Sequence, residues 1–196
     1  MPSEVSQNEL RTWVEEARDG SLDAFYQLYS HYSKPIFNFI WRLIGSADEA
    51  EDLTQDTFLK VHTELVRLRD PAQFRFWLYR IARNEVYQRL RQTQRRIEVS
   101  IDNDEIAYFD FLPDESHGLD PEKRILGKEL QLMIQQALQT LRPKYRDVFV
   151  LAVFERMSYE DITKIVGRSL LSVKTDIYRA RLAVKEYLTK YLERPR

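Results

Sequence analysis

The side chains best suited to recognising a ligand lie near the C-terminus, on a stretch with helical spacing. If Val173 and Ile177 face a core, the same helix directs four side chains that can form hydrogen bonds outward, those of Ser172, Thr175, Tyr178 and Arg179. The major groove of duplex DNA admits one helix, where arginine pairs with guanine and threonine or tyrosine meets a base edge or a thymine methyl. Neighbouring cations would hold phosphates. The predicted duplex-reading residues are Ser172, Lys174, Thr175, Tyr178, Arg179 and Arg181.

A second basic stretch, residues 69–96, holds eight arginines against two acids, Asp70 and Glu85. Spacings of three and four place Arg80, Arg83, Tyr87 and Arg91 on one helix face. Aromatic residues are interleaved with them, namely Phe76, Trp77 and Tyr79. Guanidinium groups and aromatic rings together are typical of surfaces that hold single-stranded nucleic acid. The alternative is that Trp77 belongs to the core.

Five acidic side chains between residues 48 and 56 form a carboxylate cluster. Metal catalysis would require them to converge in one pocket with further ligands, whereas on one helix most must point outward. We therefore expect a solvated or partner-binding surface, with no metal site, no cofactor and no catalytic residue. The sequence also lacks a Gly-rich phosphate loop and a nucleophile–base pattern. The cluster consists of Asp48, Glu49, Glu51, Asp52 and Asp56.

The net charge of the 196 residues is only −1, but positive and negative charges are concentrated in different segments. Residues 168–196 hold eight cations against three acids, whereas residues 97–122 hold nine acids and neither lysine nor arginine. The absence of cysteine excludes disulfides and thiolate metal sites. The first residues do not resemble a secretion signal, and every apolar run is far shorter than the roughly 20 residues needed to span a membrane. We expect a cytoplasmic protein without membrane insertion.

Capping signals divide the N-terminal half into helices. Ser21 is expected to cap the first helix, Pro35 to break or kink it, and Gly45 to end the second stripe of apolar residues. Ser46 and Glu49 form a capping box for the next helix. After Asp70-Pro71, a long basic helix is predicted over about 73–95. Its inner face is formed by Phe74, Leu78, Ile81 and Ala82.

The C-terminal half contains the signature of a helix-turn-helix. Ser158 is expected to cap a short helix that Gly167 ends, and Ser169 is expected to cap the longer basic helix that follows. An ordinary amphipathic helix with a solvated charged face is the alternative, but the capped short helix ahead of it favours DNA binding.

We therefore predict an all-α protein of two small helical domains joined by an acidic linker. The expected boundaries are an N-terminal tail or start of the first helix over 1–20, a first domain over 21–96, the linker over 97–121 and the helix-turn-helix domain over 122–196. A brief strand over 97–101 is an alternative for the start of the linker.

Four stretches carry a family resemblance: GSADEAEDLTQDTFLKV (45–61), FRFWLYRIARNEVYQRLR (74–91), ALQTLRPKYRDVFVL (137–151) and MSYEDITKIVGRSLLSVKTDIYRARLAVKEYL (157–188). They resemble the extracytoplasmic-function sigma factors of bacterial RNA polymerase, in the family's order and spacing. The resemblance covers about residues 20–96 and 122–192. It implies a promoter-specificity subunit whose partners are promoter DNA and the clamp and flap regions of core RNA polymerase.

The resemblance also implies roles for particular residues. The acidic helix would dock on the polymerase clamp through Glu51, Asp52, Gln55 and Asp56. The loop over 68–73 and the helix after it would capture unpaired bases of the minus-ten element, while the last helix would read the minus-thirty-five element as duplex. An anti-sigma factor is a further expected partner. The expected minus-ten residues are Arg69, Asp70, Phe74, Arg75, Trp77, Arg80, Arg83, Asn84, Tyr87 and Arg91.

The chain departs from the family pattern in the last helix. The family usually has a small residue where Leu171 stands and often a basic one at Asp176, so a phosphate contact at that position is not expected here. Two other functions stay open on the residues alone. One is a free-standing helix-turn-helix regulator that binds duplex sites without polymerase. The other is a helical metal-dependent enzyme that uses the carboxylate cluster.

Overall fold

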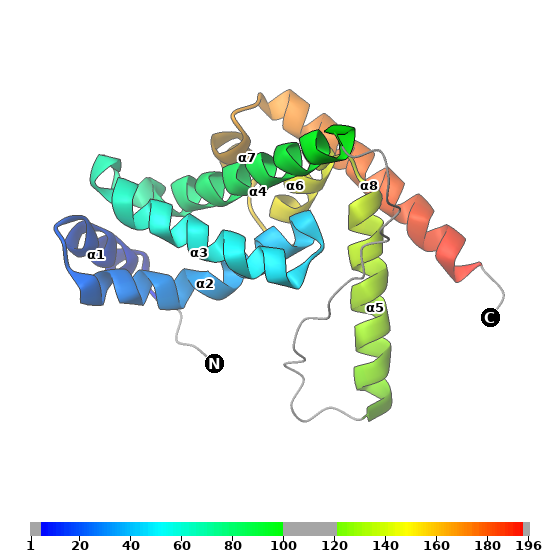
Figure 1. Ribbon diagram of the computed structural model, residues 1–196, viewed down its shortest axis with the longest axis horizontal. Helices are drawn as coiled ribbons and strands as arrows, with labels where there is room; N and C mark the ends of the chain where they lie inside the picture. Colours follow the sequence, from blue (N-terminus) through cyan, green and yellow to red (C-terminus); the bar gives the residue numbers. More distant parts are fainter. Residues whose placement is uncertain (1–4, 100–120, 194–196) are drawn as a thin grey trace. The chain divides into compact units, whose positions relative to one another are not determined.

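The computed structural model describes residues 5–99 and 121–193, and within these two ranges all regular structure is helical, as predicted (Figure 1). The chain divides into two compact units, one of residues 1–40 and 50–102 and one of residues 41–49 and 103–196. The elements are α1 (Gln7–Arg18), α2 (Leu22–Ile44), α3 (Ala47–Glu64), η1 (Leu65–Arg67), η2 (Pro71–Gln73), α4 (Phe74–Val99), α5 (Pro121–Thr140), α6 (Pro143–Val153), α7 (Tyr159–Val166) and α8 (Leu170–Leu192).

Helix α2 continues through Pro35, so of the predicted break or kink at this proline the break is wrong. A proline inside a helix removes one hydrogen bond and costs about 3 kcal/mol. Burial offsets this cost, since each large apolar side chain taken out of water contributes roughly 1.5–3 kcal/mol. The buried face continues on both sides of the proline with Leu28, Tyr32, Ile36, Phe39 and Ile40. Gly45 then adopts a φ of 92°, as its predicted capping role requires.

Residues 7–18 form a separate helix, α1, where the sequence analysis expects a tail or the start of the first helix. Ser6 Oγ accepts a hydrogen bond from the Glu9 amide at 3.2 Å, and Glu9 Oε2 accepts one from the Ser6 amide at 2.8 Å. This capping box is visible in the sequence as Ser-x-x-Glu. Val14 is buried, and α1 packs against η1 and η2. Helix α1 therefore supports the loop that precedes α4.

Helices α2, α3 and α4 pack side by side in the first unit (Figure 1). The Tyr29 and Phe58 rings join α2 to α3 at 4.9 Å, and the Phe39 and Tyr79 rings join α2 to α4 at 5.1 Å. The predicted inner face of α4 is buried throughout. Because α4 extends to Val99, the alternative of a strand is wrong for residues 97–99. Residues 100 and 101, like the rest of the expected linker up to residue 120, lie outside the described residues.

The predicted helix-turn-helix is present in the second unit, where α6, α7 and α8 pack against one another and α5 packs against α8. Ser158 Oγ accepts from the Asp161 amide at 3.1 Å, and Ser169 Oγ accepts from the Ser172 amide at 3.3 Å. Gly167 has a φ of 66°, the left-handed conformation that ends α7 and turns the chain into α8. The apolar core between these helices includes Ile162, Ile165, Val173, Ile177 and Ala180.

Candidate nucleic-acid interface

Helix α4 presents the predicted single-strand face to solvent. Arg80, Asn84 and Arg91 are exposed, while Arg83 and Tyr87 are half-buried. The Arg83 guanidinium carbon lies 4.3 Å from the centre of the Tyr87 ring, and Arg91 Nε donates to the Tyr87 carbonyl at 3.2 Å. A planar cation and an aromatic ring therefore lie together on one face, which is the combination that stacks on unpaired bases.

The acid within this helix is withdrawn from its exposed side. Glu85 is only 8% exposed, and its Oε1 atom lies 2.5 Å from Lys60 Nζ on α3. Over the part of α4 whose side chains the structure describes, residues 74–93, Glu85 is the one carboxylate. The exposed side of this part therefore carries cations without an acid, which favours binding to phosphates.

The structure removes two aromatic residues from the expected single-strand surface. Phe74 is 3% exposed and Tyr79 is 2% exposed, so both belong to the core and neither can stack on a base in this conformation. Trp77 is half-buried, and Arg69, Asp70 and Arg75 are exposed. The Asp70 carboxylate accepts from the Ala72 amide at 3.0 Å, so it caps η2.

A continuous series of aromatic contacts links α1 and α2 to the start of α4, next to the loop that precedes this helix. The ring centroids are separated by 6.3 Å for Trp13–His31, 4.7 Å for His31–Tyr32, 5.5 Å for Tyr32–Phe74 and 6.1 Å for Phe74–Trp77. Burial, together with the cation of Arg75, lowers the pKa of His31, so its ring is neutral at pH 7. Phe74 therefore supports the loop and Trp77 from the core, and the DNA contact that the resemblance implied for it stays a prediction.

Helix α8 presents the predicted duplex-reading face. Lys174, Tyr178, Arg179 and Arg181 are exposed, and Tyr178 is 63% exposed. The remaining two predicted residues of this face, Ser172 and Thr175, are half-buried. All six predicted residues lie on α8, and the opposite side of the helix is buried through Val173 and Ile177.

Asp176 lies on the buried side of α8, away from the predicted DNA-binding face. It is 5% exposed, and its Oδ2 atom accepts from Arg168 Nη1 at 2.6 Å. Arg168 Nη2 also donates to Asp147 Oδ1 on α6 at 3.2 Å and to the Lys144 carbonyl at 3.3 Å. This burial agrees with the expectation that position 176 makes no phosphate contact, and Arg168 joins the turn to α6 and α8 through this carboxylate.

The start of α6 contributes two residues that the sequence analysis did not identify. Arg179 Nη1 lies within 3.3 Å of Tyr145 Oη, and the Lys144 ammonium lies 4.8 Å from the centre of the Tyr145 ring. The hydrogen bond from Arg179, aided by the Lys144 cation, lowers the pKa of Tyr145. Lys144 is exposed beside the predicted guanine-reading arginine, so it can bind a phosphate there. The sequence signal is the run of cations around Pro143, at the first position of α6.

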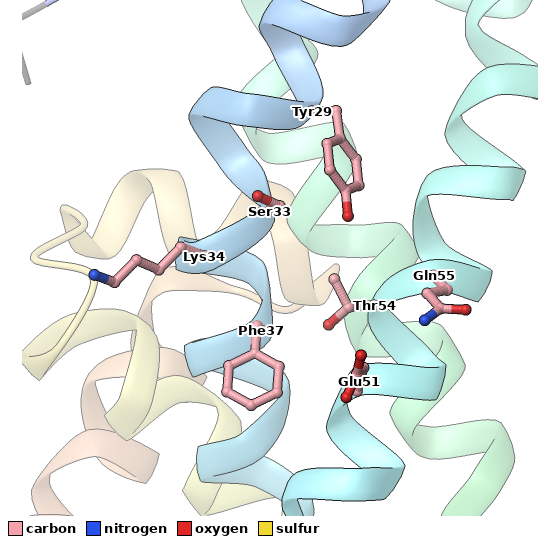
Figure 2. Close-up of a pocket in the computed structure, with 7 residues that line it drawn as sticks. All are labelled: Tyr29, Ser33, Lys34, Phe37, Glu51, Thr54 and Gln55. Carbon is pink, nitrogen blue, oxygen red and sulfur yellow. The ribbon is translucent and has the colours of Figure 1, made fainter. Parts of the chain in front are cut away.

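One acidic residue of α3, Glu51, lines a pocket between α2 and α3 (Figure 2). Glu51, Asp52, Gln55 and Asp56 are all exposed. The pocket has a volume of about 300 Å³ and lies within the first unit. Its lining contains two aromatic rings, two aliphatic hydroxyl groups, one ammonium, one carboxylate and one amide. The lining residues are Tyr29, Ser33, Lys34, Phe37, Glu51, Thr54 and Gln55. A pocket of this volume can accept an apolar side chain of a partner, and cations of the partner can pair with Glu51 and the other exposed acids of α3.

Among the described residues, no group of three or more His, Asp or Glu side chains is placed to hold a metal ion. The carboxylates of α3 therefore form a dispersed surface. None of the described helices combines the length and apolar character that crossing a membrane would require.

Comparisons with known proteins agree with this geometry. The family profile "Sigma-70 region 2" matches residues 28–96, and the profile "Sigma-70, region 4" matches residues 131–184. The chain is 30% identical to the ECF RNA polymerase sigma factor SigW of Bacillus subtilis over 89% of this chain and 94% of that one. It is 33% identical to the RNA polymerase sigma-H factor of Pseudomonas aeruginosa, over 96% of this chain and 98% of that one. The sigma factor RpoE, solved in complex with the anti-sigma factor NepR from Bartonella quintana, matches with a TM-score of 0.70 and 27% identity, over 88% of this chain and 100% of that one.

Proposed function

We infer the function of this chain from its membership of the ECF RNA polymerase sigma factors, the sigma-70-related family to which it belongs. It binds core RNA polymerase and directs transcription initiation at particular promoters. We propose that it does so in the bacterial cytoplasm, as a polymerase subunit without enzymatic activity of its own, and that its promoters belong to a stress or envelope-type response.

One observation carries the assignment of the two DNA-binding surfaces. Each DNA-binding stretch, residues 74–93 of α4 and residues 170–185 of α8, holds one acid, and that acid is buried: Glu85 pairs with Lys60 and Asp176 with Arg168. Over these two stretches, the outward faces of α4 and α8 therefore present cations to a ligand without a competing carboxylate. Such surfaces bind the phosphate backbone of a nucleic acid, and the exposed aromatic and arginine side chains on them supply contacts to bases.

The first unit is assigned to the minus-ten element. Arg69, Arg75, Arg80, Arg83, Asn84 and Arg91 would hold the backbone and edges of the unpaired strand, while Trp77 and Tyr87 would stack on its bases. Phe74 and Asp70 keep the loop and η2 in place. The Arg83–Tyr87 contact supports this assignment because it brings a guanidinium plane and a ring together before any base arrives.

The second unit is assigned to the minus-thirty-five element. The exposed face of α8 would enter the major groove, with Arg179 on a guanine and Lys174, Arg181 and Lys144 on phosphates. Ser172, Thr175 and Tyr178 would meet base edges.

The acidic face of α3 is assigned to core polymerase. Glu51 and Gln55 line the pocket of Figure 2, and Asp52 and Asp56 are exposed on the same helix. We propose that the clamp of the polymerase docks here, and that the second unit contacts the flap. An anti-sigma factor would inhibit the chain by covering these surfaces. The similarity to a sigma factor that was solved with an anti-sigma factor supports this partner.

Transcription from selected promoter fragments tests the proposal. Genomic fragments are captured with the chain reconstituted on core polymerase, and run-off transcription is then measured with core alone, chain alone and both together. We expect defined transcripts only when both are present. Tight binding of the captured duplexes by the chain alone at physiological salt, with no effect of core on transcription, would instead indicate a free-standing regulator.

Replacing Arg179 with alanine should weaken recognition of one base pair. An arginine–guanine pair supplies about 1–3 kcal/mol of discrimination, so we expect a similar loss on the preferred element and a relaxed preference at one position. The measurement is the affinity of the holoenzyme for promoters that carry each base pair in turn. Lys174→Ala is the matched control and should weaken all of them uniformly. Uniform weakening by Arg179→Ala as well would contradict base readout at this residue.

Replacing Tyr87 with alanine should impair promoter opening more than promoter binding. Stacking of one base on an aromatic ring contributes roughly 1–3 kcal/mol, and this contact forms only when the strand is unpaired. Closed-complex affinity and the rate of open-complex formation are measured separately, for Tyr87→Ala and for Arg80→Ala. Equal losses in both steps would show that this face binds duplex DNA. Tyr26→Ala, which truncates an exposed tyrosine of α2, is the control.

A further inference from the structure

The centre of the outward face of α8 is apolar, although its flanks are basic. Leu171 is 75% exposed, Tyr178 is 63% exposed and Leu182 is 50% exposed. Together with Thr175 they recur at steps of four, three and four, so they form one stripe along the helix. Leu171 is the second residue of α8, in the turn that follows the Ser169 cap.

The polar groups near this stripe leave it available for an apolar contact. Thr175 Oγ1 donates to the Leu171 carbonyl at 2.8 Å, so its hydroxyl is engaged by the helix itself. Asp176, the one acid between residues 169 and 185, is buried against Arg168. A leucine side chain can neither donate nor accept a hydrogen bond, so its specificity must come from an apolar group of the ligand.

The charges around the stripe identify the ligand. Lys174, Arg181 and Lys185 are exposed along one side of it, and Arg179 is exposed along the other. An apolar strip flanked by three cations on one side and by one on the other fits the major groove of duplex DNA, where phosphates form both edges. In this groove the apolar group is the C5-methyl of thymine.

We propose that Leu171 is a specificity-determining residue that reads the C5-methyl group of a thymine in the minus-thirty-five element. This inference rests on the proposed function, because it requires α8 to lie in the major groove. It extends that function by naming the chemical group that is read. Because of Leu171, the chain prefers promoters that carry thymine at the position opposite the first turn of α8.

Deoxyuridine substitution tests the proposal, because it removes the methyl group and leaves every hydrogen bond of the base pair unchanged. Each thymine of the upstream element in a captured promoter is replaced singly, and the affinity of the holoenzyme is measured. We expect a loss of about three- to fivefold at one or two thymines, the value for one buried methyl-sized group. In Leu171→Ala the same substitutions should have almost no effect.

Leu182→Ala is the matched control, since it truncates the same side chain on the same stripe about 16 Å farther along the helix. It should keep the full deoxyuridine penalty of the unmodified chain. Both leucines are exposed, so neither substitution is expected to change the stability of the fold. Thermal unfolding of each variant checks this. An undiminished penalty in Leu171→Ala, or no methyl-sensitive thymine, would overturn the inference while leaving the proposed function in place. Absence of any complex on the unsubstituted duplex would overturn both.

Discussion

Replacing Arg168 with alanine is expected to destabilise the second unit by about 3–5 kcal/mol, the usual cost of removing one partner from a buried ion pair. Asp147 is fully buried and Asp176 is 5% exposed, and both carboxylates accept hydrogen bonds from the Arg168 guanidinium. Without it, two buried negative charges repel each other. Hydrogen exchange of the α6 and α8 amides measures the effect within the intact chain, and amides of α3 serve as the internal reference.

Two further variants separate the cost of buried charge from the loss of a side chain. Lys185→Ala removes an exposed cation from α8 and should change the free energy of exchange by no more than about 0.5 kcal/mol. Arg168→Met combined with Asp147→Asn and Asp176→Asn removes all three charges and should recover much of the lost stability. Unchanged protection of α6 and α8 in Arg168→Ala would show that the carboxylates do not depend on this guanidinium.

The double substitution Asp52→Arg with Asp56→Arg is expected to abolish most binding to core polymerase. Both side chains are exposed on α3, so the fold tolerates the change. If a basic surface of the clamp docks on this face, the substitution replaces two attractions with like-charge repulsion. Such contacts cost several kcal/mol, and about 2–4 kcal/mol corresponds to roughly 30- to 1,000-fold in affinity. The measurement is the dissociation constant of the chain and core polymerase.

The matched control for this prediction is Glu16→Arg, which reverses an exposed acid on α1. It changes the net charge in the same direction but lies on α1 and not on the acidic face of α3, so it should alter core affinity less than about threefold. Because the effect is electrostatic, the difference between the two variants should shrink as salt is raised. Equal affinities for the double variant and the control would place the polymerase contact on another face.

Local signals in the sequence were sufficient to predict the helix-turn-helix. Ser158, Gly167 and Ser169 fix the ends of α7 and α8 through hydrogen bonds and backbone conformations within a few residues. The helical spacing of apolar residues also predicted that Phe74 lies on the inner face of α4, and it is buried there. The contrary expectation, that Phe74 contacts DNA, came from the family resemblance. Periodicity therefore predicted the burial of Phe74 correctly, while its contact with DNA stays a prediction.

Features that depend on distant partners could not be predicted. Asp176 lies three residues after Val173 and four before Ala180, so its spacing indicates the buried side of α8. A carboxylate there requires a counter-charge, and the pairing with Arg168 and Asp147 arises only when the turn meets α6. Pro35 is a similar case, because burial along all of α2 outweighs the local preference for a break.

The most direct test of the account is the chemical reactivity of unpaired thymines on a promoter captured by the reconstituted holoenzyme. Permanganate footprinting is performed with core alone, with the chain alone and with both. The account predicts a reactive bubble around the minus-ten element only when both are present, and a weaker bubble with Tyr87→Ala at saturating holoenzyme. Protected duplex without reactive thymines, at the same sites with and without core, would contradict it.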